Sequence, residues 1–218
     1  MTKPNHKNTK AVHVASITEA TIEECFALAT KTFIGGSTLH QALGIGLAEY
    51  TDYLWPSFKD MIALGYSLEA RDGATGKLLG VMVTTDWKSI SNPRSVPKKF
   101  EPLIAIGDDL SAQYADYREV LKGDALLVDM GVVDPAARGL GVYKKLRQET
   151  HELAAKNGFR FVLGELSSAA TQHVVCHNFG HNVVAEIDFN RFEFEGHFPF
   201  ATIESPKSIV MTEGEIGS

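Results

Sequence analysis

The chain has 218 residues, of which 44% are hydrophobic and 22% are charged, a balance typical of a soluble globular protein. Its formal net charge of −6 speaks against a general nucleic-acid-binding protein, and its two widely separated cysteines speak against a disulfide framework and indicate a reducing, cytoplasmic location. No apolar run approaches the roughly 20 residues that cross a bilayer, so no membrane association is expected. Residues 1–10 predict a flexible, polar tail, and residues 11–218 predict one domain.

The first part of the chain predicts a strand followed by helices. Residues 11–17 alternate in polarity as a strand does, and Thr18 is the expected N-cap of the helix that follows. Residues 35–46 predict a flexible loop with a short helical piece. Residues 47–65 predict a helix that is bent or interrupted at Pro56.

The rest of the chain predicts strands that alternate with helices. The near-continuous apolar run 124–133 predicts a strand buried on both faces. Residues 100–123 predict a second helical region, and the segment 100–126 looks like an insertion into the domain and not like a separate domain. We further expect a hairpin over 66–87, a helix over 141–157 ended by Gly158, a strand over 159–166, a short helix over 168–179 and late strands over 182–196 and 208–213. The fold class is therefore α/β, with a central mixed sheet of about seven strands and helices on both faces.

The stretch VDPAARGLGVYKKL, residues 133–146, places a glycine-containing loop between a strand and the start of a helix. The backbone N–H groups of residues 138–142 lack intrahelical partners there, and the helix dipole adds roughly half a positive charge. This arrangement suits a phosphate or a pyrophosphate. The alternative is a tight turn in which the glycines serve sterics alone. The loop is neither a Walker loop nor a dinucleotide-binding fingerprint, because it has only two glycines and no lysine followed by serine or threonine.

The same stretch resembles motif A of the GCN5-related N-acetyltransferase superfamily, V-x-P-x-x-R-G-x-G-x-[GA]-x-x-L, which is met by Val133, Pro135, Arg138, Gly139, Gly141 and Leu146. The resemblance implies that the loop amides bind the pyrophosphate of acetyl-CoA and that the preceding strand pairs with the pantetheine arm. Tyr143 stands where the family has a small residue, so its side chain either narrows the pocket or points away from the phosphates. The implied cofactor-binding residues are Met130, Val132, Val133, Arg138, Gly139, Leu140, Gly141 and Val142.

Two further segments are similar to the same superfamily. Residues 168–180 resemble motif B, in which the position of a tyrosine that is frequently the general acid falls on Cys176. The segment FIGGSTLHQALGI, residues 33–45, resembles the amine-site segment of insect and nematode arylalkylamine N-acetyltransferases. A glutamate of that segment is thought to be the catalytic base, but Ser37 takes its position here, so the role is not carried over. Ser37 and Thr38 are the implied substrate-binding residues.

Acetyl transfer to an amine requires a proton acceptor, a polarised thioester and a proton source for the leaving thiolate. Asp129 ranks first as the base, because burial in an apolar strand raises the pKa of a carboxyl group toward a useful range. Its alternative role is to pair with a neighbouring structural group. Glu165, at the end of the next strand, is a second candidate base or a ligand for the substrate ammonium. The candidates for protonating the thiolate are Cys176 and His177, with Ser168 and His173 behind them.

The histidines of the chain raise two further questions. His173, His177 and His181 lie near Cys176 in sequence and are candidate ligands of a metal ion. The sequence has no second group of ligands with the paired spacing of zinc sites, so no metal is expected. His40 is expected to be an exposed loop histidine rather than a base.

These features predict an acetyl-CoA-dependent N-acetyltransferase that acts on the primary amine of a small molecule by direct attack in a ternary complex. The acidic overall charge favours a cationic arylalkylamine or polyamine-like acceptor. The alternatives are acetylation of an aminoglycoside or a protein lysine, an acyl-CoA sensor without turnover, and a phosphate-binding structural protein. The expected partner is the small-molecule amine, with no nucleic acid, and the C-terminal strands are a candidate homodimer interface.

Overall fold

A computed structural model describes residues 12–89 and 95–217, and the predicted tail over residues 1–10 lies outside these ranges. The strands are β1 Val12–Ser16, β2 Leu68–Asp72, β3 Leu78–Asp86, β4 Ala125–Val133, β5 Phe161–Leu166, β6 Asn182–Asp188 and β7 Ser208–Glu215. The α-helices are α1 Ile22–Gly36, α2 Thr38–Ala42, α3 Leu47–Ala63, α4 Glu101–Tyr117, α5 Val142–Lys156 and α6 Ala169–Asn178. Short 3-10 helices lie at Trp87–Ser89, Lys98–Phe100 and Pro135–Ala137.

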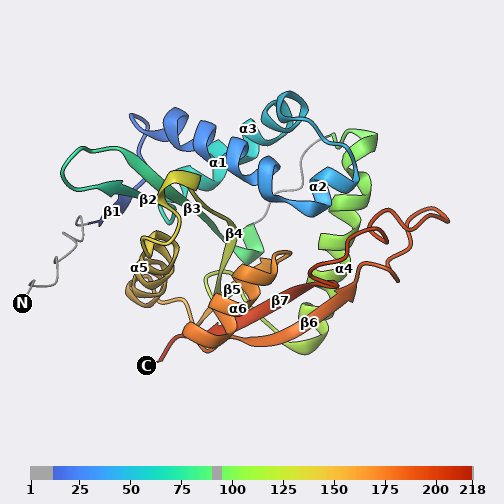
Figure 1. The fold of residues 1–218 in the computed structure, drawn as a ribbon. Coiled ribbons are helices and arrows are strands. Elements are labelled where there is room, and N and C mark those ends of the chain that lie inside the picture. Colours follow the sequence, from blue (N-terminus) through green and yellow to red (C-terminus); the bar gives the residue numbers. More distant parts are fainter. Residues whose placement is uncertain (1–11, 90–94, 218) are drawn as a thin grey trace, which may run out of the picture.

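The strands form one seven-stranded sheet in the order β1-β2-β3-β4-β5-β7-β6 (Figure 1). Every neighbouring pair is antiparallel except β4 and β5, which are parallel. A parallel pair requires a crossover connection, and α5 supplies it. Helices α5 and α6 pack on one face of the sheet, and α1, α3 and α4 pack on the other. The fold class expected from the sequence, a mixed sheet with helices on both faces, is confirmed.

The central strand β4 is apolar because both of its faces are covered. Leu126 and Val128 pack in the cluster under α5, while Ala125 and Leu127 pack in the cluster under α4. All four side chains are buried, as expected for residues 124–133. Full burial of a leucine or valine side chain contributes about 1.5–3 kcal/mol, so this strand anchors the whole sheet.

Helix α4 belongs to the core, so the interpretation of residues 100–126 as an insertion is wrong. Its buried side chains Ile106, Leu110 and Tyr114 recur at helical spacing and pack in the same cluster as β5 and β7. The Tyr114 hydroxyl also donates a 2.7 Å hydrogen bond to the buried carboxylate of Glu213. Arg118 donates two more to the same carboxylate, at 2.8 and 2.9 Å. These contacts fix α4 against β7.

Strands β4 and β5 are paired only over their first residues, and this creates the opening in which the site lies. Their last pair is Val128 with Gly164. On the other side of β4, Val128 faces Thr84 and Met130 faces Val83, so Asp129 is the extra residue of a β-bulge. The backbone therefore changes course at Asp129, and the two parallel strands diverge beyond it.

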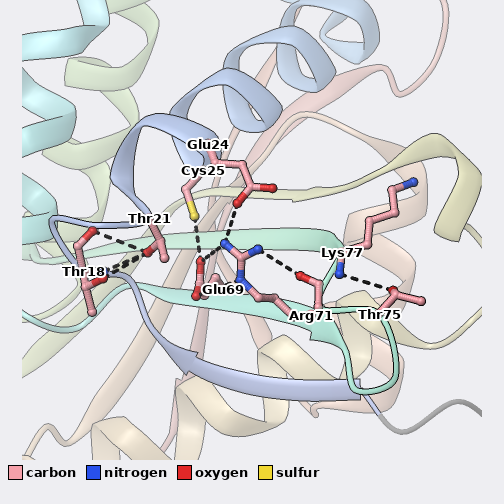
Figure 2. A network of polar contacts seen from close by, with 9 residues as sticks. Thr18, Thr21, Glu24, Cys25, Glu69, Arg71, Thr75 and Lys77 are labelled. Atoms are coloured by element: carbon pink, nitrogen blue, oxygen red, sulfur yellow. Dashed lines mark hydrogen bonds and ion pairs between the residues drawn. The ribbon is translucent and has the colours of Figure 1, made fainter.

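A polar network joins α1 to β2 at the edge of the sheet (Figure 2). The Cys25 thiol donates to Glu69 at 3.1 Å, and Arg71 donates to Glu69 at 2.9 Å and to Glu24 at 2.7 Å. Burial, followed by the Glu69 carboxylate, raises the pKa of the Cys25 thiol well above its ordinary value. Cys25 is thus a structural, unreactive cysteine that helps to position α1.

Three expected boundaries in the chain are wrong. Helix α1 begins at Ile22 with Thr21 at its N-cap, because the chain first makes a turn in which Thr18 contacts Thr21. Helix α3 continues through Pro56, so of the two alternatives there the interruption is wrong, and β6 ends at Asp188 instead of extending to residue 196. Within the described ranges, no helix has both the length and the apolar character that a membrane span requires.

Candidate active site

Three cavities lie in series along the opening between β4 and β5. The loop cavity, about 390 Å³, lies at the start of α5; the cleft cavity, about 430 Å³, lies between the diverging strands; and the inner cavity, about 270 Å³, lies between β4, α3 and α4. The loop and cleft cavities share Val133, Arg138 and Tyr143. The cleft and inner cavities share Phe33, Ser37, Asp129, Glu165 and Ser167.

The loop before α5 presents free backbone donors to the loop cavity. Gly139 and Gly141 have φ angles of +78° and +77°, a left-handed conformation that only glycine adopts without strain. A Cβ atom would meet nothing at either position, so the glycines serve the backbone conformation and not a close approach to protein atoms. Among the described residues, no acceptor contacts the N–H groups of Gly139, Gly141 or Val142.

Two of the five loop N–H groups that were expected to be free, those of residues 138 and 140, donate hydrogen bonds within the protein. The N–H of Arg138 donates to Pro135 at 3.4 Å, and that of Leu140 donates to Ala137 at 3.3 Å. Both bonds are long, and the Leu140 side chain is exposed. The first intrahelical bond of α5 runs from Lys145 to Gly141, so the turn still offers the free donors and dipole of a helix start.

Tyr143 points into the protein and not away from it. Its ring lies so close to Gly131 that a Cβ atom there would approach it to 2.9 Å, so the glycine makes room for the ring. Tyr143 lines both the loop cavity and the cleft cavity, and its hydroxyl accepts a 3.2 Å hydrogen bond from Arg147. The side chain therefore forms part of the wall of both cavities.

Asp129 and Glu165, the two candidate bases, are brought together where the cleft and inner cavities meet. Asp129 lies deep in the fold, yet the cavity leaves its side chain accessible to solvent. Burial raises the pKa of Asp129 to about 6. Burial, then the charges of Asp129 and Asp108, raise the pKa of Glu165 to about 8. At neutral pH the first carboxyl group is therefore mostly ionised and the second mostly protonated.

His40 is buried, so its interpretation as an exposed loop histidine is wrong. It lines the inner cavity, accepts or donates a 2.7 Å hydrogen bond with the Ser37 hydroxyl, and packs edge-on against Tyr50. Burial lowers the pKa of His40 to about 4, so the ring is neutral at pH 7. Ser37, an expected substrate-binding residue, lines both the cleft and the inner cavity.

The remaining expected site residues are scattered. Val132 and Val133 line the cleft cavity, and Met130 lines the inner cavity. The Thr38 hydroxyl is buried without a hydrogen-bond partner among the described residues and does not line these cavities. Cys176 does not line them either, and burial raises the pKa of its thiol, so its role as proton donor stays a prediction.

The histidine cluster separates into two pairs. His173 and His177 stack at 4.4 Å on one helix, whereas His181 contacts His151 of α5 at 3.1 Å. Across the described part of the chain, no three or more histidine, cysteine or carboxylate side chains are grouped so that they could hold a metal ion.

Several cavity residues gave no signal in the sequence. Tyr50 and Tyr53 of α3 and Asp108 of α4 line the inner cavity. The tyrosines occupy positions that are also compatible with a helix packed on a sheet, so only the tertiary fold identifies them. Arg147 of α5 is expected from the sequence to add positive charge beside the glycine loop, and the structure places it buried in the wall of the cleft cavity. Asp108 was hidden by the reading of its segment as an insertion.

No protein-family model matches the chain, and no curated protein matches its sequence. Solved structures nevertheless share its fold. The C-terminal condensation domain of Ebony, in complex with β-alanyl-dopamine, matches with a TM-score of 0.85 and 15% identity over 94% of this chain and 99% of that domain. Arylalkylamine N-acetyltransferase 2 from Aedes aegypti matches with a TM-score of 0.76 and 18% identity over 94% and 99% of the two chains.

A polyamine N-acetyltransferase of Drosophila melanogaster, which forms N-acetylagmatine, matches with a TM-score of 0.69 and 13% identity over 94% of this chain and all of that one. At these identities the likeness establishes the fold alone. The chain thus has the fold of arylalkylamine and polyamine N-acetyltransferases, which agrees with the superfamily resemblance of its glycine loop.

Proposed function

We propose that the chain is an N-acyltransferase that uses a coenzyme A thioester, with acetyl-CoA as the reference donor, and acylates the primary amine of a small molecule. The observation that carries this proposal is the series of three cavities with a carboxyl pair at the inner junction. An anion-binding loop, a cleft for an extended arm and an adjoining acceptor cavity are the parts that a ternary complex needs. The fold of amine acetyltransferases supports the same conclusion.

The donor binds along the loop and cleft cavities. The free N–H groups of Gly139, Gly141 and Val142 hold the pyrophosphate, and Arg138 and Lys144, which line the loop cavity, add positive charge. Beyond Val128 the edges of β4 and β5 are no longer paired with each other, so their backbone groups are available to the amides of a pantetheine arm. The thioester then reaches the junction with the inner cavity.

The carboxyl pair supplies the proton transfers. Asp129, ionised at neutral pH, accepts a proton from the substrate ammonium and leaves a nucleophilic amine. The amine nitrogen attacks the thioester carbonyl, the C–N bond forms and the C–S bond breaks. Glu165, protonated at neutral pH, gives its proton to the leaving thiolate and, as a carboxylate, then takes the extra proton that the new amide nitrogen still carries. Asp129 releases the proton it accepted to solvent, so both carboxyl groups return to their starting states. No residue of the protein is acylated in this sequence of steps.

The inner cavity suits a small cationic amine with an apolar body. Its walls include the aromatic side chains of Phe33, Tyr50 and Tyr53, and it also contains the carboxyl groups of Asp108 and Asp129. Aromatic faces and carboxylates both attract an ammonium ion. The acceptors named for the neighbours, arylalkylamines and polyamines, have this chemistry. At about 270 Å³, the cavity is too small to take a folded protein or a multi-ring aminoglycoside whole.

A thiol-release assay tests the proposal. The purified chain is mixed with acetyl-CoA and a panel of arylalkylamines, diamines and polyamines, and free coenzyme A thiol is followed with a chromogenic disulfide. Steady release that depends on both an amine and the protein is expected. Tight binding of acetyl-CoA without turnover on any amine would instead identify an acyl-CoA sensor. Equal affinity for acetyl-CoA and for simple nucleotides would refute a thioester site.

A further inference from the structure

The cleft cavity contains a buried arginine whose charge nothing in the described part of the protein neutralises. Arg147 is fully buried, and both of its terminal nitrogens, Nη1 and Nη2, lack a hydrogen-bond partner. The one polar contact that it makes with the described residues is the 3.2 Å hydrogen bond from Nε to the hydroxyl of Tyr143. Among the described residues, no carboxylate lies within ion-pair distance of it.

The histidines near Arg147 do not supply a counter-charge. His151 and His181 are neutral at pH 7, because burial, and after it the charge of Arg147, lower the pKa of His151 to about 4 and that of His181 to about 3. They therefore provide no negative charge. A buried ion without a counter-charge or hydrogen bonds is strongly destabilised, and proteins pair such groups. The counter-charge is accordingly expected from a ligand.

Arg147 lies at the closed end of the cleft. A Cβ atom on Gly164 would lie 3.0 Å from Nη2, so the glycine makes room for the guanidinium. Gly164 forms the last pair that joins β5 to β4, and the residues that follow on the two strands, Asp129 and Glu165, mark the proposed place of the thioester. The pyrophosphate lies at the opposite end, on the loop before α5. The part of a donor that reaches this corner is thus its acyl group.

We propose that Arg147 binds a carboxylate on the acyl group, and that the preferred donors are coenzyme A thioesters of dicarboxylic acids. This inference rests on the proposed function. The planar guanidinium offers two parallel N–H donors, which match the two oxygens of a carboxylate. In the reaction the amine nitrogen bonds to the thioester carbon and the C–S bond breaks. The second carboxylate does not react and remains free in the amide product.

Matched pairs of donors test the inference by binding alone. Succinyl-CoA and butyryl-CoA differ by a carboxylate in place of a methyl group, as do malonyl-CoA and propionyl-CoA. Calorimetry with the full chain is expected to show at least tenfold tighter binding of one dicarboxylic donor than of its neutral counterpart. In Arg147→Met this preference falls below twofold, while the affinity for the neutral donor changes little. Arg147→Lys keeps part of the preference, since lysine keeps the positive charge but lacks the two parallel N–H donors of the guanidinium.

Lys144→Met is the matched control, because it removes one positive charge from the same helix at the loop cavity. This substitution is expected to lower the affinity for every donor by a similar factor and to leave the preference for dicarboxylic donors unchanged. Thermal unfolding checks folding, and Arg147→Met is expected to be at least as stable as the parent chain. Equal binding within both pairs, or a preference that survives Arg147→Met, would overturn the inference. If no thioester binds at all, the proposed function fails, whereas binding and turnover of acetyl-CoA without a preference remove this inference alone.

Discussion

Glu165→Gln is expected to make the folded protein more stable at high pH. A carboxyl group whose pKa rises on folding binds its proton more tightly in the folded state, so stability falls as pH increases from the unfolded value to the folded value. For Glu165 the pKa rises from an ordinary value of 4.5 to about 8. At 1.36 kcal/mol per pKa unit, ionising this group at pH 9 costs the folded state about 5 kcal/mol as an upper bound. Glutamine has nearly the same shape and no charge, so it removes this cost.

Urea unfolding at pH 5, 7 and 9, followed by tryptophan fluorescence, measures the effect. The variant and the parent chain should be nearly equal in free energy of unfolding at pH 5, and the variant should be more stable by about 2–5 kcal/mol at pH 9. Glu119→Gln, at an exposed glutamate, is the control and should show little pH-dependent difference. A parallel pH dependence for Glu165→Gln and the parent chain would show that this carboxyl group is not held protonated by its surroundings.

Three further substitutions separate chemistry, donor binding and stability. Asp129→Asn should lower kcat by about 10²–10⁴-fold and remove the rise of kcat/KM with pH near pH 6, while the affinity for acetyl-CoA stays unchanged. A variant that turns over as fast as the parent chain would exclude Asp129 as the base. Gly141→Asp should abolish acetyl-CoA binding in calorimetry, because it places an anion at the phosphate site and a side chain where φ is +77°. Arg118→Met should destabilise the fold by about 1–3 kcal/mol in urea unfolding, since the buried Glu213 loses its two charged hydrogen bonds, and an unchanged midpoint would contradict this.

Features that are local in sequence could be predicted. The loop at residues 138–142 is recognisable because a proline, two glycines and a helix start are consecutive, and the structure gives both glycines the left-handed backbone that this turn requires. Asp129 could be placed in the strand before the loop and Glu165 at the end of the next strand, because a charged residue interrupts an apolar run at each position. Parallel strands on either side of a crossover helix end at the same edge, so their meeting follows from the topology.

Features that depend on distant contacts could not be predicted. His40 follows a glycine pair in a polar segment, which is typical of an exposed loop, but α3 and α4 close over it in the fold. Arg147 occupies a helix position that a solvated arginine also fits, and only the absence of a side chain on Gly164 makes room for it in the interior. The core role of α4 was missed because its buried residues are separated by polar ones whose partners, such as Glu213, lie about a hundred residues away in sequence.

The β-bulge at Asp129 accounts for why a carboxyl side chain can lie inside a central strand. In a regular strand, residues 128 and 130 would face one side of the sheet and residue 129 the other. With the extra residue in β4, Val128 packs under α5, while Asp129 and Met130 both line the inner cavity on the opposite face. The same irregularity lies where the pairing with β5 ends, so the cleft opens there and the carboxylate of Asp129 faces the inner cavity. Alternation in the sequence shows neither effect, because the apolar residues continue through the bulge.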